Sequence, residues 1–478
     1  MLNNHIVSKI LTNFSHSPTP SQLNLIEKAA LFITEAQQGS VFVVTGYAGT
    51  GKTTIIKAIV ETLASVNINS VLLAPTGRAA KVMSLYTNKP AFTIHKYIYR
   101  QKSASDGFGS FALDFNKHND TYFIIDEASM ISNGSTDQSV FGSGRLLDDL
   151  VEYVDSGQRC KTIIIGDVAQ LPPVKLDESP ALSHKVLSAY YHQVFSSNLT
   201  DVVRQQQESY ILKNATLIRD RLYNNMDGYF KLDIISGGDV IPLSGADLIE
   251  TLATEFDNVG IEQTIVVTPS NKRANQFNQG IRNQVLWREE EISVTDRLMV
   301  VRNNYFWIEP EKDKADFIAN GDTIEIIRIR KYQELYGFRF ADVTIKLTDY
   351  NDKEIDVKIM LDTLSSESPS LPYDDSVRLY NEIAKDYPEI KSKKKLWEEL
   401  RKNPYFNALQ VKFAYAVTCH KAQGGQWDTV FLDHGYLTEE RVGKDFLRWL
   451  YTAFTRARKR LYLVNFNDDF FEKDKLDR

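Results

Sequence analysis

The residues with the clearest chemistry form a glycine-rich run near the N-terminus, VFVVTGYAGTGKTT. Its spacing is G-x-x-x-x-G-K-T. Glycines there let backbone N–H groups approach phosphate oxygens without a Cβ in the way. The lysine can neutralise phosphate charge, and the threonine hydroxyl next to it can bind Mg²⁺. The run predicts a nucleoside triphosphate site made of Gly46, Ala48, Gly49, Thr50, Gly51, Lys52, Thr53 and Thr54.

Two acidic residues follow a second apolar run, FIIDEASM. Asp126 and Glu127 stand at the expected C-terminal end of a buried strand, where ligands bind in parallel sheets. Asp126 suits a Mg²⁺ ligand alongside Thr53, directly or through water, and Glu127 suits the polarisation of an attacking water. In a third run, TIIIGDVAQLPPV, Gln170 could hydrogen-bond a γ-phosphate. A plain strand-to-turn segment, broken by its two prolines, is the alternative for that third run.

Short runs rich in Val and Ile must position these residues. They alternate with helical patterns, including one over 55–64 after the glycine-rich run, and this alternation indicates parallel sheets covered on both faces. We therefore expect an α/β protein with one parallel sheet in each half of the chain. The predicted strands are 41–45, 71–74, 123–125 and 162–165 in the first half, and 265–268, 430–433 and 461–464 in the second.

The segment between the two sheets has a different pattern. Apolar and polar residues alternate from about 290 to 350, which is typical of antiparallel strands. A charged helical stretch follows over 375–403, with a lysine cluster at Lys391, Lys393, Lys394 and Lys395. The predicted domains are 1–200 with a hairpin insert at about 96–119, the first part of a second domain at 201–290, an insert at 291–408, and its completion at 409–478.

Composition excludes some classes of protein. A chain of 478 residues suggests about three domains, or two with inserts. Two cysteines are too few for a disulfide framework. No run of eighteen apolar residues and no signal-peptide pattern occurs, so we expect no membrane span and a cytoplasmic protein. The net charge of −6 does not exclude a local basic groove for nucleic acid.

In chain order, several segments resemble the motif set of superfamily 1 helicases, and in particular the RecD/Dda branch and its phage Dda type. The resemblance implies two RecA-like domains, a small hairpin in the first, and an SH3-like barrel with a helical insert in the second. It also implies ATP and Mg²⁺ as cofactors and 5′→3′ movement on single-stranded DNA. The segments are GYAGTGKTT, LLAPTGRAAKVM, TIHK, FIIDEASM, GDVAQLPPV, LTDVVRQ, AVTCHKAQGGQWDTVFL and LYTAFTRARKRLYLV.

The resemblance gives further residues a role. Gln22 would read adenine, with a helix-cap region centred on Ser21 as the alternative. Arg204 and Arg456 would reach the γ-phosphate from the second domain, with surface salt bridges as the alternative. Phe108 and Phe111 would be wedges of a strand-splitting hairpin, or else its own small core. The DNA contacts would be Pro75, Thr76, Arg78, Thr93, His95, Thr418, His420 and Lys421.

The expected partners are single-stranded DNA and duplex junctions, bound by a monomeric motor. The alternative function is a nucleic-acid-stimulated ATPase that binds or remodels DNA or RNA without unwinding it. The lysine cluster at 391–395 has two interpretations, a DNA contact or a solvated helix face. The sequence leaves open whether a single-strand-binding protein or a replication, recombination or repair protein is a partner.

Substitution of Lys52 by Ala tests the phosphate site. We expect ATP hydrolysis to fall by about 10²-fold or more, because charge placed against phosphates is lost. Binding of single-stranded DNA, measured by fluorescence anisotropy, should change little because Lys52 faces the nucleotide. Retention of more than about a tenth of the wild-type hydrolysis rate would contradict the assignment.

Overall fold

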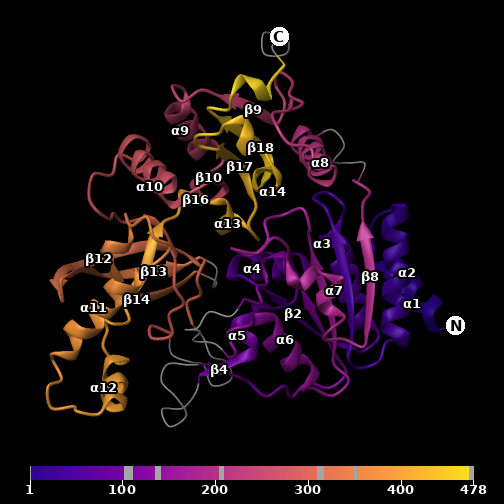
Figure 1. Ribbon diagram of the computed structural model, residues 1–478, viewed down its shortest axis with the longest axis horizontal. Coiled ribbons are helices and arrows are strands. Elements are labelled where there is room, and N and C mark those ends of the chain that lie inside the picture. The colour runs from indigo at the N-terminus through magenta and orange to yellow at the C-terminus, as the bar shows by residue number, and fades with distance from the viewer. Residues whose placement is uncertain are drawn as a thin grey trace.

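The computed structural model describes residues 2–101, 111–134, 142–203, 209–308, 317–348 and 352–472. In these ranges the chain forms two parallel sheets, a closed barrel and a two-stranded hairpin, as Figure 1 shows. This confirms the predicted α/β class with two sheets. Among the described residues, no helix is both long enough and apolar enough to cross a membrane.

The first sheet carries the glycine-rich run. Its neighbouring strands are all parallel and lie in the order β3 (Ala91–Thr93), β2 (Asn69–Ala74), β6 (Thr121–Ile125), β7 (Lys161–Gly166), β1 (Ser40–Gly46) and β8 (Gln193–Leu199). All four strands predicted in the first half are therefore present.

Helices cover both faces of this sheet, because successive side chains of a strand point to opposite sides. Along β1, Phe42 and Val44 enter one core and Val41 and Val43 enter the other. On the Phe42 side lie α1 (Leu2–Asn13), α2 (Pro20–Glu35), α3 (Lys52–Ser65) and Met83 of α4 (Gly77–Thr87). On the Val41 side lie α5 (Ile94–Ile98), α6 (Leu146–Asp155) and α7 (His184–Leu187).

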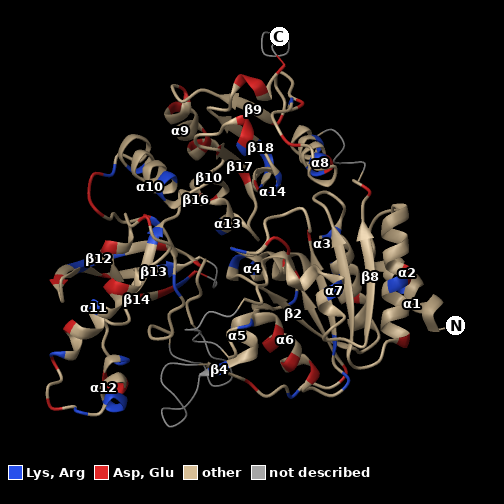
Figure 2. Ribbon diagram, viewed as in Figure 1, with Lys and Arg blue, Asp and Glu red and all other residues tan. Residues whose placement is uncertain are grey.

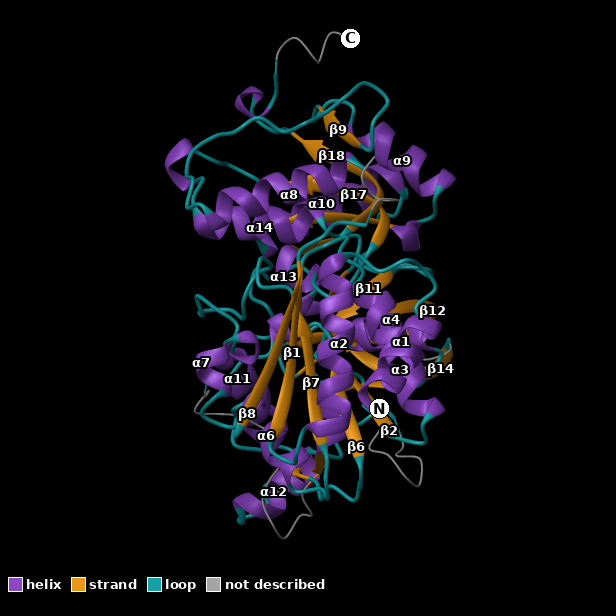
Figure 3. Ribbon diagram, turned by 90° about the vertical axis from the view of Figure 1, so that its right-hand side faces the viewer, coloured by secondary structure: helices purple, strands orange, loops and turns teal. Residues whose placement is uncertain are grey.

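The second sheet is also parallel and lies above the first in Figures 1 and 3. Its strand order is β16 (Ala416–Thr418), β10 (Thr264–Thr268), β17 (Trp427–Asp433), β18 (Ala457–Val464) and β9 (Val240–Leu243). One face packs on α8 (Tyr210–Tyr223) and α14 (Lys444–Phe454), and the other on α9 (Leu248–Asn258) and α10 (Asn271–Gly280). The short helix α13 (Cys419–Ala422) follows β16 and faces the first domain.

The insert between the two parts of this sheet is a closed barrel. Its strands are β11 (Arg297–Val300), β12 (Thr323–Leu335), β13 (Phe338–Leu347), β14 (Lys353–Met360) and β15 (Leu409–Phe413). The predicted boundary at residue 408 is therefore wrong, because β15 pairs with β11 and β14 to close the barrel. The apolar segment LQVKF resembles a strand of either sheet, so only its pairing could assign it.

Two helices, α11 (Tyr373–Ala384) and α12 (Lys393–Leu400), lie between β14 and β15 and form the predicted charged helical part. They pack on an outer apolar cluster of the barrel that includes Phe338 and Phe340. The lysines of α12 lie at the outer end of the insert, away from both parallel sheets (Figure 2). This position favours the solvated-face interpretation of the cluster.

The predicted hairpin is present as β4 (Tyr99–Gln101) and β5 (Phe111–Leu113). Phe108 lies outside the described residues. Phe111 is only 4% exposed, and its ring centroid is 4.2 Å from that of Tyr305, which in turn packs against Phe317. This burial favours the alternative interpretation, a packed aromatic, and the wedge role of Phe111 remains a prediction. Through this contact, Phe111 attaches the hairpin to the segment between β11 and β12.

A buried carboxylate fixes the barrel to the second sheet. Asp296, which is fully buried, forms ion pairs with Arg282 at 3.1 Å and Arg288 at 2.6 Å. It also accepts a hydrogen bond of 2.9 Å from the hydroxyl of Tyr415. The partners come from the π-helical turn Ile281–Val285 that follows α10, from the approach to β11, and from the segment between β15 and β16. One side chain therefore orients three connections.

Substitution of Asp296 by Ala should destabilise the fold strongly. It leaves the buried Arg282 guanidinium without its charge partner, which costs about 3–5 kcal/mol. We expect a clear fall in the thermal unfolding midpoint measured by circular dichroism. The matched control is Asp356→Ala, which breaks an exposed pair with Arg330 and should change stability by less than about 1 kcal/mol. Equal midpoints for the two variants would contradict the role of Asp296.

Candidate active site

The glycine-rich run is a loop between β1 and α3 whose backbone requires glycine. Gly49 has φ 75° and Gly51 has φ 84°, both in the left-handed region. A Cβ on Gly46 would lie 2.9 Å from the Cβ of Leu199, closer than real contacts allow. The Thr50 hydroxyl donates to the Tyr47 carbonyl at 2.7 Å and holds the loop closed. The loop therefore has the glycine-dependent conformation that a phosphate cradle needs, and phosphate binding by it remains a prediction.

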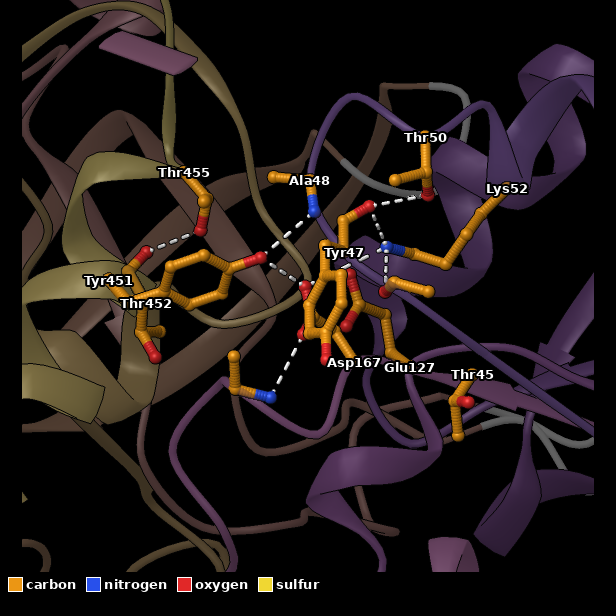
Figure 4. Close-up of polar contacts among 12 residues, drawn as sticks. Thr45, Tyr47, Ala48, Thr50, Lys52, Glu127, Asp167, Tyr451, Thr452 and Thr455 are labelled. Atoms are coloured by element: carbon orange, nitrogen blue, oxygen red, sulfur yellow. Dashed lines mark hydrogen bonds and ion pairs between the residues drawn. The ribbon is translucent and has the colours of Figure 1, made fainter. Parts of the chain in front are cut away.

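Lys52 at the start of α3 lies over this loop. Its Nζ donates to the carbonyls of Gly46 and Tyr47 at 2.7 and 2.9 Å. It also lies 3.8 Å from Oδ2 of Asp167, at the end of β7 (Figure 4). The ammonium group is therefore held at the mouth of the loop, and phosphate oxygens could replace these carbonyls as its partners.

The two predicted acids lie together at the end of β6. Oδ1 of Asp126 accepts from the Glu127 N–H at 2.8 Å, and Oδ2 accepts from the Tyr86 hydroxyl at 2.8 Å. Burial raises the pKa of both carboxyl groups, and Arg456 is the largest opposing influence on the pKa of Glu127. Glu127 has φ 54°, a left-handed backbone conformation that is uncommon for residues other than glycine. This conformation sets the direction in which the Glu127 side chain leaves the backbone.

The donor set fits Mg²⁺. Thr53 and Asp126 offer hard oxygen ligands, and Mg²⁺ completes its shell with water and nucleotide phosphates. In the described part of the chain, no group of three or more His, Cys, Asp or Glu side chains could hold a metal on its own.

Two predicted glutamines approach the same loop. Gln22 is buried; its Nε2 donates to the Thr50 carbonyl at 2.9 Å and its Oε1 accepts from the Thr19 N–H at 2.9 Å. Thr19, rather than Ser21, is therefore the cap of α2, and Gln22 braces the phosphate loop. Gln170 is buried, and its Oε1 has no hydrogen-bond partner among the described residues. Adenine reading by Gln22 and phosphate contact by Gln170 remain predictions.

A tyrosine of the second domain reaches the cradle. The hydroxyl of Tyr451 in α14 accepts from the Ala48 N–H at 2.9 Å and donates to Oδ2 of Asp167 at 2.7 Å (Figure 4). Beside it, the Thr452 hydroxyl accepts from the Leu171 N–H at 2.8 Å. The second domain thus touches the phosphate loop and the end of β7 at once.

A second contact grips the same loop. The guanidinium of Arg219 in α8 lies 4.5 Å from the ring centroid of Tyr47. Sequence reasoning missed Tyr47, Arg219 and Tyr451 as site residues. Tyr451 stands in the segment LYTAFTRAR, five residues before Arg456. From sequence alone, a tyrosine on an amphipathic helix is assigned to the hydrophobic core, so nothing marks it as a site residue. Only the packing of α14 against the first domain identifies it.

Of the two arginines predicted to reach the γ-phosphate, only Arg456 lies within the described residues. Arg204 lies outside the described residues. Arg456 is buried, and its guanidinium donates to the carbonyls of Thr452 and Gly425 at 3.0 and 3.1 Å and to the Thr455 hydroxyl. Its effect on the pKa of Glu127 places its charge near the first domain's acids. Contact of either arginine with a γ-phosphate remains a prediction.

The predicted DNA contacts lie where short helices begin. Thr76, just after Pro75, caps α4 by accepting from the Ala79 N–H at 3.2 Å, and Thr93 caps α5 in the same way. Thr418 precedes α13 without such a side-chain bond. Arg78 lies 3.9 Å over the ring of Trp427 and donates to the Gln426 carbonyl. The structure therefore brings α4 and the α13 turn together at the domain junction.

Burial reduces the positive charge of the predicted DNA-contact residues. It lowers the pKa of His95 to about 4 and also lowers the pKa of His420, so both imidazoles are neutral at pH 7. Burial and the nearby Lys412 lower the pKa of Lys421 to about 8. The two histidines could therefore offer only neutral hydrogen bonds or stacking to a strand, while Lys421 is still mostly charged at pH 7.

Two family models match the chain, an AAA domain at residues 20–238 and a UvrD-like helicase C-terminal domain at residues 413–464. The ATP-dependent RecD2 DNA helicase of Deinococcus radiodurans is 24% identical over 93% of this chain and 50% of its own length. The ATP-dependent DNA helicase dda of phage T4 is 24% identical over 81% of this chain and 86% of its own length. A Pif1 helicase from Bacteroides, solved with ADP-AlF3 and ssDNA, gives a TM-score of 0.45 at 15% identity, over 97% of this chain and 96% of that one.

Coverage differs among these relatives. The chain spans 38% of the length of a Methanocaldococcus jannaschii protein that is 26% identical to it over 92% of this chain. The RecD2 and Dda proteins have the same identity to this chain, and RecD2 aligns with more of it. The expectation that the Dda type is the nearest likeness was therefore too narrow.

Two parallel sheets that meet over one phosphate loop, with a barrel inserted into the second, define a P-loop protein with two RecA-like domains. The family models and the ordered motifs then specify the group. Together with the RecD2 and Dda relatives, they support a superfamily 1 helicase of the RecD/Dda type.

Substitution of Tyr451 by Phe tests the contact across the domains. It leaves the Ala48 N–H without its partner and removes one hydrogen bond from the Asp167 carboxylate, a cost of about 1–3 kcal/mol. We expect DNA-stimulated ATP turnover to fall roughly tenfold, because each 1.4 kcal/mol changes a rate about tenfold. Nucleotide affinity, measured by fluorescence, should change little because the phosphate loop itself is intact.

The matched control is Tyr462→Phe. Its hydroxyl donates to the buried Glu255 at 3.0 Å, wholly inside the second domain. This variant should keep normal turnover. Equal turnover in the Tyr451 and Tyr462 variants would show that the hydroxyl of Tyr451 plays no part in joining the domains.

Proposed function

We propose that the chain uses ATP and Mg²⁺ to move along single-stranded DNA and to unwind duplex DNA. The main support is a site formed by both domains, in which Tyr451 of the second domain contacts the phosphate loop of the first. The names of the RecD2 and Dda relatives, both ATP-dependent DNA helicases, support the same activity. Movement in the 5′→3′ direction is part of the proposal and rests on the resemblance to this branch.

The first domain supplies the groups for phosphate binding and hydrolysis. Backbone N–H groups of the loop would hold the phosphates, and Lys52 would exchange its two carbonyl partners for phosphate oxygens. Glu127, held in its fixed backbone conformation, would orient the attacking water and accept its proton. Mg²⁺ held by Thr53 and Asp126 would neutralise charge on the phosphates.

The second domain would complete the site by closure. Charge aimed at a transition state is most effective when it is preorganised and shielded from water. Arg456 is buried beside the domain junction and already influences Glu127. We infer that Arg456, together with Arg204, meets the γ-phosphate when the domains close, so that hydrolysis depends on the position of the second domain.

Strand movement would follow from the two-sided DNA face. Helix N-termini and hydroxyl groups suit phosphates of any sequence. The starts of α4 and α5 belong to the first domain, and the start of α13 belongs to the second. Opening and closing of the cleft would change the distance between these grips and move the protein along one strand. We infer a monomeric motor that acts at junctions of single-stranded and duplex DNA.

A strand-displacement assay tests the function directly. We expect unwinding of a duplex with a 5′ single-stranded tail, in the presence of ATP and Mg²⁺, and far less unwinding with a 3′ tail. Glu127→Gln should bind ATP and DNA but fail to unwind, because water is no longer polarised. DNA-stimulated ATP hydrolysis without displacement of either duplex would instead identify a remodelling ATPase. RNA-tailed duplexes distinguish the nucleic acid used.

A further inference from the structure

The Tyr86 hydroxyl of α4 makes a polar contact at the acidic end of β6 that neither the sequence motifs nor the mechanism uses. It donates to Oδ2 of Asp126 at 2.8 Å. The ring of Tyr86 packs against the apolar core formed by α1, α2 and α3 with the sheet. The hydroxyl is therefore held in place by packing, as a group must be if it is to orient another.

This contact completes the restraint of the carboxylate. Oδ1 of Asp126 accepts from the N–H of Glu127 at 2.8 Å, and the Asp126 N–H donates to the Leu73 carbonyl at 3.0 Å. The backbone and both carboxylate oxygens are thus fixed from different directions. Without the Tyr86 hydroxyl, one oxygen would lose its partner and the carboxylate could rotate about its terminal bond.

We propose that Tyr86 is the positioning residue for the carboxylate that binds Mg²⁺, and that α4 links this carboxylate to the DNA-binding junction. The first part rests on the proposed function, since it takes Asp126 as a metal ligand. Mg²⁺ demands near-octahedral geometry, so the orientation of each protein oxygen matters. Loss of an outer partner of a metal ligand commonly weakens metal binding about 10–100-fold.

The link to the junction comes from the other end of the same helix. In the first turn of α4, Arg78 stacks on Trp427 and donates to the Gln426 carbonyl, both of the second domain. A Cβ on Gly424 would lie 2.9 Å from the Cβ of Ala79, so the α13 turn packs closely on the helix. The last turn of α4 carries Tyr86.

The helix has 11 residues and is about 16 Å long, at about 1.5 Å of rise per residue. A rigid helix of this length joins the face where the strand is gripped to the metal carboxylate. Movement of the second domain against the first turn of α4 would therefore change the position of Tyr86. In this way, a domain movement that accompanies DNA binding would change the orientation of the carboxylate that binds Mg²⁺.

The test compares Tyr86→Phe with Tyr122→Phe in the full chain. Tyr122 lies in the same core, and its hydroxyl donates to the Ile33 carbonyl at 3.2 Å, away from the acids. The first readout is the affinity for Mn²⁺ in the presence of ADP, measured by electron paramagnetic resonance. We expect it to weaken roughly tenfold in Tyr86→Phe and to stay at the wild-type value in Tyr122→Phe.

The second readout is ATP turnover as a function of Mg²⁺ concentration, with and without single-stranded DNA. In Tyr86→Phe, the half-saturating Mg²⁺ concentration should rise by a similar factor, and the stimulation by DNA should fall. Wild-type Mn²⁺ affinity in Tyr86→Phe would overturn the positioning role. An unchanged ratio of stimulated to basal turnover at saturating Mg²⁺ would overturn the link through α4.

A third variant separates this inference from the proposed function. Asp126→Asn should weaken Mn²⁺ binding at least as much as Tyr86→Phe. If Asp126→Asn binds Mn²⁺ normally, then Asp126 is no metal ligand, and both the site assignment and the inference fail. If Asp126→Asn weakens binding and Tyr86→Phe does not, the site stands and only the inference fails.

Discussion

The hydroxyl of Tyr451, between the N–H of Ala48 and the carboxylate of Asp167, is the contact on which the two-domain arrangement depends. It joins α14 of the second domain to the phosphate loop and to the end of β7. Asp167 is buried and Ala48 is partly buried, so loss of this shared partner would cost free energy. A shift of α14 would therefore act directly on the phosphate loop.

The opposite side of the cleft is joined in a similar way. Arg78 of α4 stacks on Trp427 of the second domain. Phe111 of the hairpin packs against Tyr305, which lies in the segment between β11 and β12 of the barrel insert. The barrel is itself fixed to the second sheet by Asp296. The face proposed to bind DNA therefore includes segments that are far apart in the sequence.

Several features were predictable because they are local. A strand, a glycine-rich turn and a helix follow one another at the phosphate loop, so the spacing of Gly46, Gly51 and Lys52 is sufficient to identify it. Asp126 and Glu127 follow their strand directly. The alternation of apolar runs and helical patterns predicted both parallel sheets. By contrast, β15 has the composition of a sheet strand, and only its pairing with β11 and β14 places it in the barrel.

The order of the motifs, the class of the fold and the glycine-rich loop could be predicted from the sequence alone, because each depends on neighbours within a few positions. The contacts that those residues make across long sequence separations arise only from the folding of the chain. In the tertiary structure, Tyr451 contacts the phosphate loop, Tyr86 contacts Asp126, and Phe111 packs against Tyr305. The physical reason is that a tyrosine or phenylalanine on an apolar face is equally compatible with core and with site. Only the packing of distant helices and strands determines which polar group a tyrosine hydroxyl reaches. The same packing determines whether a phenylalanine ring is exposed to water.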